Sequence, residues 1–198
     1  MKNLVIGSAI AIVLFTACSN GSSNTASEDK KDSDVAAQNT TAQEATTTNV
    51  NDSKATPVKE LVSQYLQLKN ALASDNDKDA ATAGSGIMNA LGKVDKTAFT
   101  AEQKKVYDDV ADDTKEMAEH ISTNAGKIEH QREHFDMLSD DVYDLVKTFG
   151  AGQTLYKDFC PMYNNKKGAF WLSETKEIKN PYLGKKMPTC GSVKEELK

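Results

Sequence analysis

The residues best suited to chemistry are sulfur donors in the C-terminal part of the chain. Cys160 and Met162 stand on either side of a proline. Met187 and Cys190 stand on either side of a Pro-Thr pair. A thiol and a thioether beside a proline form a compact pair of soft ligands, and two such pairs suit one soft cation such as Cu(I). The spacing therefore predicts a soft-metal site at these four positions.

The same two cysteines support a second interpretation. Cys160 and Cys190 are the only cysteines after residue 18, and an isolated pair commonly forms a disulfide in an oxidising compartment. The chain lacks a Cys-x-x-Cys pair and zinc-ribbon spacing. On spacing alone, a disulfide between Cys160 and Cys190 therefore remains an alternative to the metal site.

Imidazole donors are available at helical spacing. His130 and His134 are four residues apart, so on a helix they project from one face and suit a shared metal. At about 100° per residue, both lie beside the expected apolar stripe and not at its centre. A solvated helix surface is the ordinary explanation for such a pair. His120 is a weaker candidate for the same site.

Length and charge narrow the class of protein. The chain has 198 residues, of which the part with enough apolar residues to fold corresponds to one domain. Its 29 acidic and 24 basic residues give a net charge of −5 without a large basic block. Because nucleic-acid binding needs clustered lysine and arginine, a nucleic-acid partner is not expected.

Residues 1–18 have the features of a bacterial export signal. Lys2 supplies the positive start, and an apolar run from Leu4 to Phe15 leads to small residues before Cys18. The end of this segment resembles a lipobox, which implies lipidation of Cys18. Phe15 stands where that motif commonly has leucine, and secretion without an anchor is the alternative. We expect a lipoprotein of the cell envelope, lipid-anchored to a membrane, with its domain facing the periplasm or the cell surface.

Residues 19–55 form the next segment. They are mainly Ser, Thr, Asn, Ala, Asp and Lys, with no aromatic residue. Such a segment buries too little apolar surface to offset the entropy of folding. It is expected to be a disordered tether, which leaves 56–198 as the folded domain.

Helical periodicity covers most of this domain. Helices are expected at about 58–73, 80–94, 101–123 and 127–149. Thr100 and Gln103 match a capping box, and Gly150 is the expected stop of the last helix. Short turns between such helices predict an all-α fold, an up-down-up-down four-helix bundle.

The segment after Gly150 has a different pattern. Residues 168–173 are the best candidate for a short strand or half of a hairpin, after a turn at 164–168. Another turn is expected at 180–184, and 192–195 is expected to begin a last frayed helical turn. We therefore expect an irregular C-terminal segment whose aromatic residues cap one side of the bundle.

Motifs for catalysis are absent from the sequence. It contains no nucleophile elbow, Walker loop or dinucleotide fingerprint. Gly84 and Gly86 lie within an expected helix, without the following Gly-Lys-Ser/Thr of a phosphate loop, and are interpreted as sites of close helix packing. We expect a protein that is not an enzyme.

The C-terminal motifs also carry a family resemblance. In order, they are His130–Phe135, Leu138–Ser139, Tyr156, Cys160–Met162, Gly168–Ser173, Ile178, Asn180–Gly184, Met187 and Cys190–Gly191. Together they resemble an uncharacterised helical domain, a domain of unknown function, of exported Bacteroidetes proteins, over about Val58 to Val193. The same kind of domain occurs attached to membrane-fusion adaptors of heavy-metal, copper-type efflux systems. The resemblance therefore implies copper handling and a metal-efflux partner.

Combined with the resemblance, the donor residues predict one mixed site. Its expected ligands are Cys160, Met162, Met187, Cys190, His130 and His134. Cu(I) accepts thiolate, thioether and imidazole ligands, and zinc on the two cysteines and two histidines is the alternative. The expected function is a membrane-tethered lipoprotein that buffers copper or passes it to an efflux partner. The alternative is a helical protein-interaction module without metal, closed by the Cys160–Cys190 disulfide.

Overall fold

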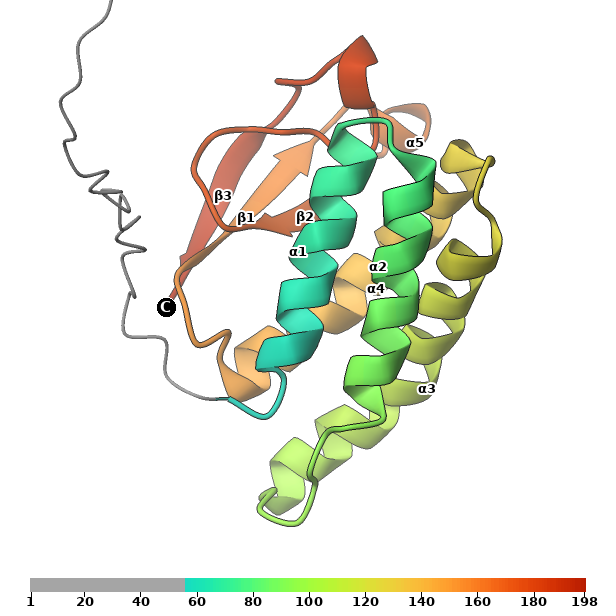
Figure 1. The fold of residues 1–198 in the computed structure, drawn as a ribbon. Helices are drawn as coiled ribbons and strands as arrows, with labels where there is room; N and C mark the ends of the chain where they lie inside the picture. Colours follow the sequence, from blue (N-terminus) through green and yellow to red (C-terminus); the bar gives the residue numbers. More distant parts are fainter. Residues whose placement is uncertain (1–55) are drawn as a thin grey trace, which may run out of the picture. The chain divides into compact units, whose positions relative to one another are not determined.

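The computed structural model describes residues 56–198 (Figure 1). The predicted export signal at 1–18, with Cys18, and the predicted tether at 19–55 lie outside the described residues. Four helices come first, followed by a small sheet. The helices are α1 (Lys59–Ala73), α2 (Asp77–Leu91), α3 (Ala101–Thr123) and α4 (Ile128–Phe149). Within 56–198, no helix combines the length and apolar character needed to cross a membrane.

Local sequence signals set the ends of these helices. The Asn76 side chain caps α2 by accepting a hydrogen bond from the backbone N–H of Asp79. At the start of α3, Thr100 and Gln103 form the predicted capping box. Gly150 ends α4 with a φ of 76°, a conformation that glycine adopts without strain. All four predicted helices are confirmed, with ends within a few residues.

Glycine allows close packing between helices that are neighbours in sequence. A Cβ atom at Gly84 would lie 2.9 Å from the backbone oxygen of Ala118 in α3. A Cβ atom at Gly86 would collide with the Gln64 side chain of α1. Both glycines therefore serve the predicted packing role. The helices contact one another in order, α1 with α2, α2 with α3 and α3 with α4.

The C-terminal part corrects the prediction of an all-α fold. It contains β1 (Leu155–Cys160), the short helix α5 (Tyr163–Lys166), β2 (Ala169–Ser173), the 3₁₀ turn η1 (Gly184–Lys186) and β3 (Ser192–Leu197). The strands form an antiparallel sheet in the order β2-β1-β3. Residues 192–195 were expected to begin a helical turn; instead they pair with β1, because backbone hydrogen bonds to a distant strand outweigh a weak local preference.

A buried hydrogen-bond chain joins the sheet to the helices. The Tyr65 hydroxyl accepts a hydrogen bond from the backbone N–H of Leu172 in β2 at 3.0 Å. It also contacts the Ser139 hydroxyl of α4 at 2.8 Å, and that hydroxyl donates to the Phe135 carbonyl. Trp171 is fully buried in the same core. The predicted packing of C-terminal aromatic residues against the helices is therefore confirmed, and β2 contacts both α1 and α4 (Figure 1).

Candidate metal centre

Three histidines from two helices form one cluster. His120 lies near the end of α3, and His130 and His134 lie in the first half of α4. One potential ligand atom from each lies within 4.8 Å of the other two. Among residues 56–198, this is the one such group of three histidine, cysteine or carboxylate ligands. The sequence has three histidines in total, so the fold brings together all of them.

The α3–α4 turn and a buried glutamine position the cluster. The turn contains Gly126, whose φ of 88° is favourable for glycine. From α4, the buried Gln131 donates one hydrogen bond to the Ile121 carbonyl at 3.0 Å and another to the Asp77 carbonyl at 2.9 Å. These bonds hold α4 to the end of α3 and the start of α2. They thereby fix the position of α4 beside the end of α3, next to His130.

Met117 determines which nitrogen of His134 is free. The Nδ1 atom of His134 lies 3.3 Å from the Met117 sulfur. A thioether has no proton to give, so Nδ1–H must be the donor. In neutral His134 the lone pair is then on Nε2, which lies 3.1 Å from Nε2 of His130. The nitrogen suited to a metal ion therefore points into the cluster.

Carboxylates contact the other two histidines. The Nδ1 atom of His130 lies 3.4 Å from a carboxylate oxygen of Glu133. Glu116 is 3.8 Å from Nε2 of His120. A carboxylate that accepts the outer N–H of a ligating imidazole orients the ring and increases its basicity. Glu133 is placed to do this for His130 when Nε2 of His130 binds an ion.

The distance between His130 and His134 is compatible with a shared ion. Two nitrogen ligands of a tetrahedral ion with bonds of about 2.0–2.1 Å are about 3.3 Å apart, close to the 3.1 Å between His130 and His134. The His120 ring is stacked on His134 with centroids 4.3 Å apart. Its ligand nitrogen lies within 4.8 Å of those of His130 and His134, and its side chain is 44% exposed.

Burial and charge favour the neutral, metal-binding form of His134. The pKa of His134 is lowered, mainly by burial and further by His120 and His130. Only the neutral ring has a lone pair available for an ion. The His130 side chain is 39% exposed, which leaves the cluster open to solvent. The site combines a prepared ligand with access for an incoming ion.

The two cysteines lie outside the histidine cluster. Cys160 ends β1 and is fully buried, and Cys190 is partly buried in the loop before β3. Their thiols are free, and burial together with the neighbouring Cys160 raises the pKa of the Cys190 thiol. Met162 and Met187 are exposed side chains near these cysteines in sequence. The histidine cluster contains no cysteine, so the donors predicted for one mixed site form two groups.

Arg132, in the middle of the His130–His134 motif, attaches α4 to other parts of the fold. It is buried, and its Nε–H donates to the Pro181 carbonyl at 2.8 Å. Its Nη2 group donates to the Leu72 carbonyl at 2.9 Å and to the Asp75 carboxylate. Arg132 therefore attaches α4 to α1 and to the C-terminal loop. Within one motif, His130 and His134 belong to the candidate site, whereas Gln131 and Arg132 anchor the helix.

The prediction from the sequence treated His120 as a weaker candidate ligand. It did not include Met117, Glu116 or Glu133 among the site residues. One signal for His120 was available. His120 and His130 are each five residues from Ala125 in the α3–α4 turn. A short turn folds α4 back along α3, so positions equally distant from it come opposite each other.

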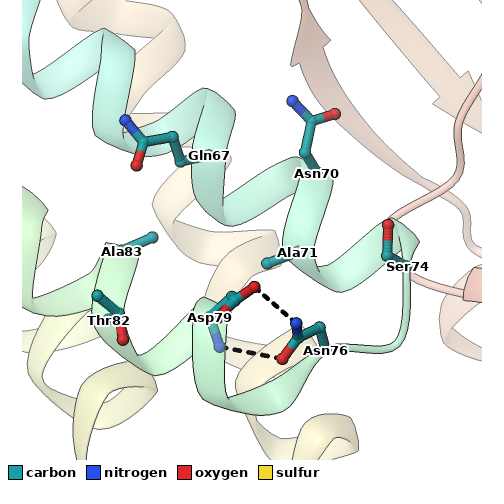
Figure 2. A pocket seen from close by; sticks show the side chains of 8 residues that line it. All are labelled: Gln67, Asn70, Ala71, Ser74, Asn76, Asp79, Thr82 and Ala83. Atoms are coloured by element: carbon teal, nitrogen blue, oxygen red, sulfur yellow. Dashed lines mark hydrogen bonds between the residues drawn. The ribbon is translucent and has the colours of Figure 1, made fainter. Parts of the chain in front are cut away.

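A separate groove lies between α1 and α2 (Figure 2). It has a volume of about 530 Å³. Its lining includes Asn70, Asn76 and Asp79, whose polar groups have structural partners. Asn76 donates to the Asp79 carboxylate at 2.6 Å, and Asn70 donates to Glu174 at 2.8 Å. These contacts assign the lining side chains to helix capping and to attachment of the loop after β2.

Comparison with known proteins places the histidines within a recognised sequence unit. No curated protein and no solved structure matches the chain. A family model does match, over residues 61–154. The matched part runs from α1 to just before β1, so it includes all three histidines and ends before Cys160. The family is described as "Protein of unknown function (DUF3347)", and the helical part of this chain thus matches a domain of unknown function.

Proposed function

We propose that this protein is a metal-binding protein of the bacterial cell envelope that holds a copper ion on His120, His130 and His134. In this proposal, lipidated Cys18 anchors it to a membrane, and the domain buffers copper or passes it to components of a metal-efflux system. The export and lipidation features of 1–18 support the location. The resemblance to domains attached to copper-type efflux adaptors supports the partner.

The observation that carries the proposal is the convergence of every imidazole in the chain. Three histidines on two helices have ligand atoms within 4.8 Å of one another. The Met117 contact directs Nε2 of His134 inward, and the Glu133 carboxylate lies where it can accept a hydrogen bond from Nδ1–H of His130. Solvated surface histidines would need neither contact.

The three imidazole donors limit which metal ions the site can hold. Imidazole suits copper and zinc, whereas magnesium and calcium need clustered oxygen ligands. Copper is the first choice because it binds a given set of nitrogen donors more tightly than the other divalent first-row ions. Zinc is the alternative, since three histidines with one open position also make a sound zinc site. Partial exposure of His120 and His130 suits a site that exchanges its ion.

The sulfur donors have no necessary part in this centre. Cys160 and Cys190 lie outside the cluster, and Met162 and Met187 are exposed side chains. The proposal therefore moves the metal from the predicted mixed site to the histidines, and this change is testable.

The test is a competitive titration of the full chain with copper. Cu(I) is added without oxygen, and Cu(II) in a parallel experiment, each against a chromophoric chelator. We expect one ion per chain. Replacing His134 by Ala should weaken binding by more than the about 10–100-fold that loss of a ligand's hydrogen-bond partner costs. Zinc is titrated in the same way to rank the two metals.

Matched variants separate the two donor groups. Cys160→Ser and Cys190→Ser should leave the affinity unchanged, whereas His120→Ala and His130→Ala should lower it. Loss of binding in the cysteine variants, with no change in the histidine variants, would contradict the proposal and return the site to the sulfur donors. Absence of competition by the unsubstituted chain with copper and with zinc would also reject it.

A further inference from the structure

The cysteine pair has chemistry that the histidine centre does not use. We infer that Cys160 and Cys190 form a reversible redox site, in which a disulfide compound oxidises the two thiols to a bond that ties the C-terminal loop to the end of β1. This inference is independent of metal binding. It rests on how the fold presents the two thiols.

The sheet brings the two cysteines to the same place. Phe159 in β1 pairs with Ser192 in β3, so the next positions outward are Cys160 and Gly191. Gly191 has a φ of 146°, and a Cβ atom there would lie 3.1 Å from the Phe159 carbonyl. Only glycine allows this close approach. Cys190 is thereby placed beside Cys160, and burial together with the neighbouring Cys160 raises the pKa of the Cys190 thiol.

The loop holds Cys190 in position through its backbone. The Cys190 N–H donates to the Met187 carbonyl at 3.2 Å, and the Asn180 amide donates to the Cys190 carbonyl at 2.7 Å. The same Asn180 side chain accepts hydrogen bonds from the N–H groups of Tyr182 and Leu183. Asn180 is fully buried. The loop therefore fixes the backbone position of Cys190.

The two thiols differ in access, and this sets the order of the reaction. Cys160 is fully buried, whereas Cys190 is partly exposed. Cys190 loses its proton and attacks a disulfide R–S–S–R, which forms a Cys190–S–S–R bond and releases one thiolate. Cys160 then loses its proton and attacks the Cys190 sulfur, which releases the second thiolate. The two protons leave with the two R–SH products, and the protein is oxidised by two electrons.

The bond would close the segment from 161 to 189 into a covalent loop. This segment contains α5, β2 and η1, together with the exposed Met162 and Met187. Closing a loop of this size restricts the unfolded chain and stabilises the folded one. Reduction by a thiol would reverse the change, since Cys190 remains accessible. The C-terminal loop thus has a tied and an untied form.

The test uses the full chain with Cys18→Ser, in which Cys160 and Cys190 are the only cysteines. The reduced protein is treated with oxidised glutathione in the presence of a metal chelator and then alkylated. Intact mass should show loss of two hydrogen atoms, no alkyl groups and no retained glutathione. The midpoint of thermal unfolding should rise by several degrees on oxidation and return when dithiothreitol is added.

Single variants test the order of attack. In Cys160→Ser, one glutathione should remain attached at Cys190, because the resolving thiol is missing. Cys190→Ser should gain no glutathione, because Cys160 is buried. The inference is overturned if the parent retains glutathione or if both of its thiols are still alkylated after oxidation. Oxidation of the Cys18→Ser parent alone gives this result, so the test holds even if a Cys160 or Cys190 variant fails to fold.

Discussion

The histidine centre and the cysteine pair respond to burial in opposite ways. Burial favours the neutral form of any ionisable group. For His134 the neutral form is the metal ligand, and the pKa is lowered. For Cys190 the neutral form is the unreactive thiol, and burial together with the Cys160 hydrogen bond raises the pKa. The same physical effect therefore favours the metal-binding form of His134 and disfavours the thiolate form of Cys190.

The supporting structure differs between the two regions as well. The histidines lie on α3 and α4, which are long helices joined by a short turn. Cys190 lies in the segment between η1 and β3 and is held by hydrogen bonds from a loop. A ligand set on regular helices keeps its geometry, whereas a loop tolerates the change between two thiols and a disulfide. Each region is suited to the chemistry assigned to it.

Breaking the connection between the regions should have the largest effect on stability. Arg132 attaches α4 to Leu72 and to Pro181 in the C-terminal loop. Arg132→Met would leave the buried Leu72 and Pro181 carbonyls without these donors and the Asp75 carboxylate without its cation. We expect the free energy of unfolding to fall by about 3–5 kcal/mol. Urea denaturation followed by circular dichroism measures this change.

A surface charge on the same pair of helices supplies the control. Lys105→Met removes an exposed ion pair with Asp109 on α3, and surface pairs contribute little. Equal losses in Arg132→Met and Lys105→Met would mean that Arg132 does not connect the two regions.

The helical region could be predicted well from the sequence because its signals are local. Apolar spacing of 3.6 residues, the Thr100 capping box and Gly150 each act within a few residues. The four-residue spacing of His130 and His134 also correctly indicated a shared helix face. His120 needed one further step, since its position depends on how the turn folds α4 onto α3.

The sheet could not be predicted in the same way because its pairing is not local. β1 pairs with β3 across more than thirty residues. Half of the β3 residues are charged and most are exposed, so the strand lacks the alternation of a half-buried strand. In β1, the buried position Asp158 carries a carboxyl group where an apolar residue would be expected. The position of the two cysteines relative to the histidines depended on this unpredicted geometry.

The buried carboxyl group of Asp158 in β1 should make the stability of the protein depend on pH. It is fully buried, and neither carboxyl oxygen has a hydrogen-bond partner within the part of the chain that the structure describes. Burial raises its pKa to about 7, although Lys69 acts in the opposite direction. The folded protein therefore holds this proton more tightly than the unfolded chain, whose pKa is about 3.9. Stability should fall as pH rises from about 4 to about 7, and stay low above that.

Asp158→Asn removes the titrating group and gives the test. The parent should lose about 2–4 kcal/mol over this pH range from Asp158 alone, and the variant should lack this component. Denaturant midpoints at pH 5 and pH 8 measure the difference. A variant with the same pH slope as its parent would show that Asp158 is charged in the folded protein at neutral pH.

Substitution of Glu133 tests the histidine centre. Glu133→Gln keeps the size of the side chain but removes the carboxylate that lies 3.4 Å from Nδ1 of His130. Copper affinity should fall by about tenfold, at the lower end of the range for such partners. Glu102→Gln, at the start of α3 and about 27 Å along the helix from His120, makes the same charge change as a control. If the two variants bind copper equally, Glu133 has no role in orienting His130.

Titration of His134 should have the smallest effect on stability. Its dependence on pH should be opposite in sign to that of Asp158. The pKa of His134 is lowered in the folded protein, mainly by burial and then by His120 and His130. Below the ordinary value of about 6.5 the unfolded chain takes up this proton before the folded protein does. The contribution of His134 to stability is therefore fully present above that pH and is lost as pH falls toward the folded pKa.

Proton NMR of the metal-free chain can follow the His134 ring directly. Its titration midpoint should lie below that of the same ring in urea, and zinc should suppress the titration, because a bound ion takes the place of the proton on Nε2. Met117→Leu removes the acceptor of Nδ1–H, so the two neutral forms of the ring should become more equally populated. A midpoint equal to the value in urea would mean that the cluster does not prepare His134 for a metal, and the contrast with Cys190 would then be lost.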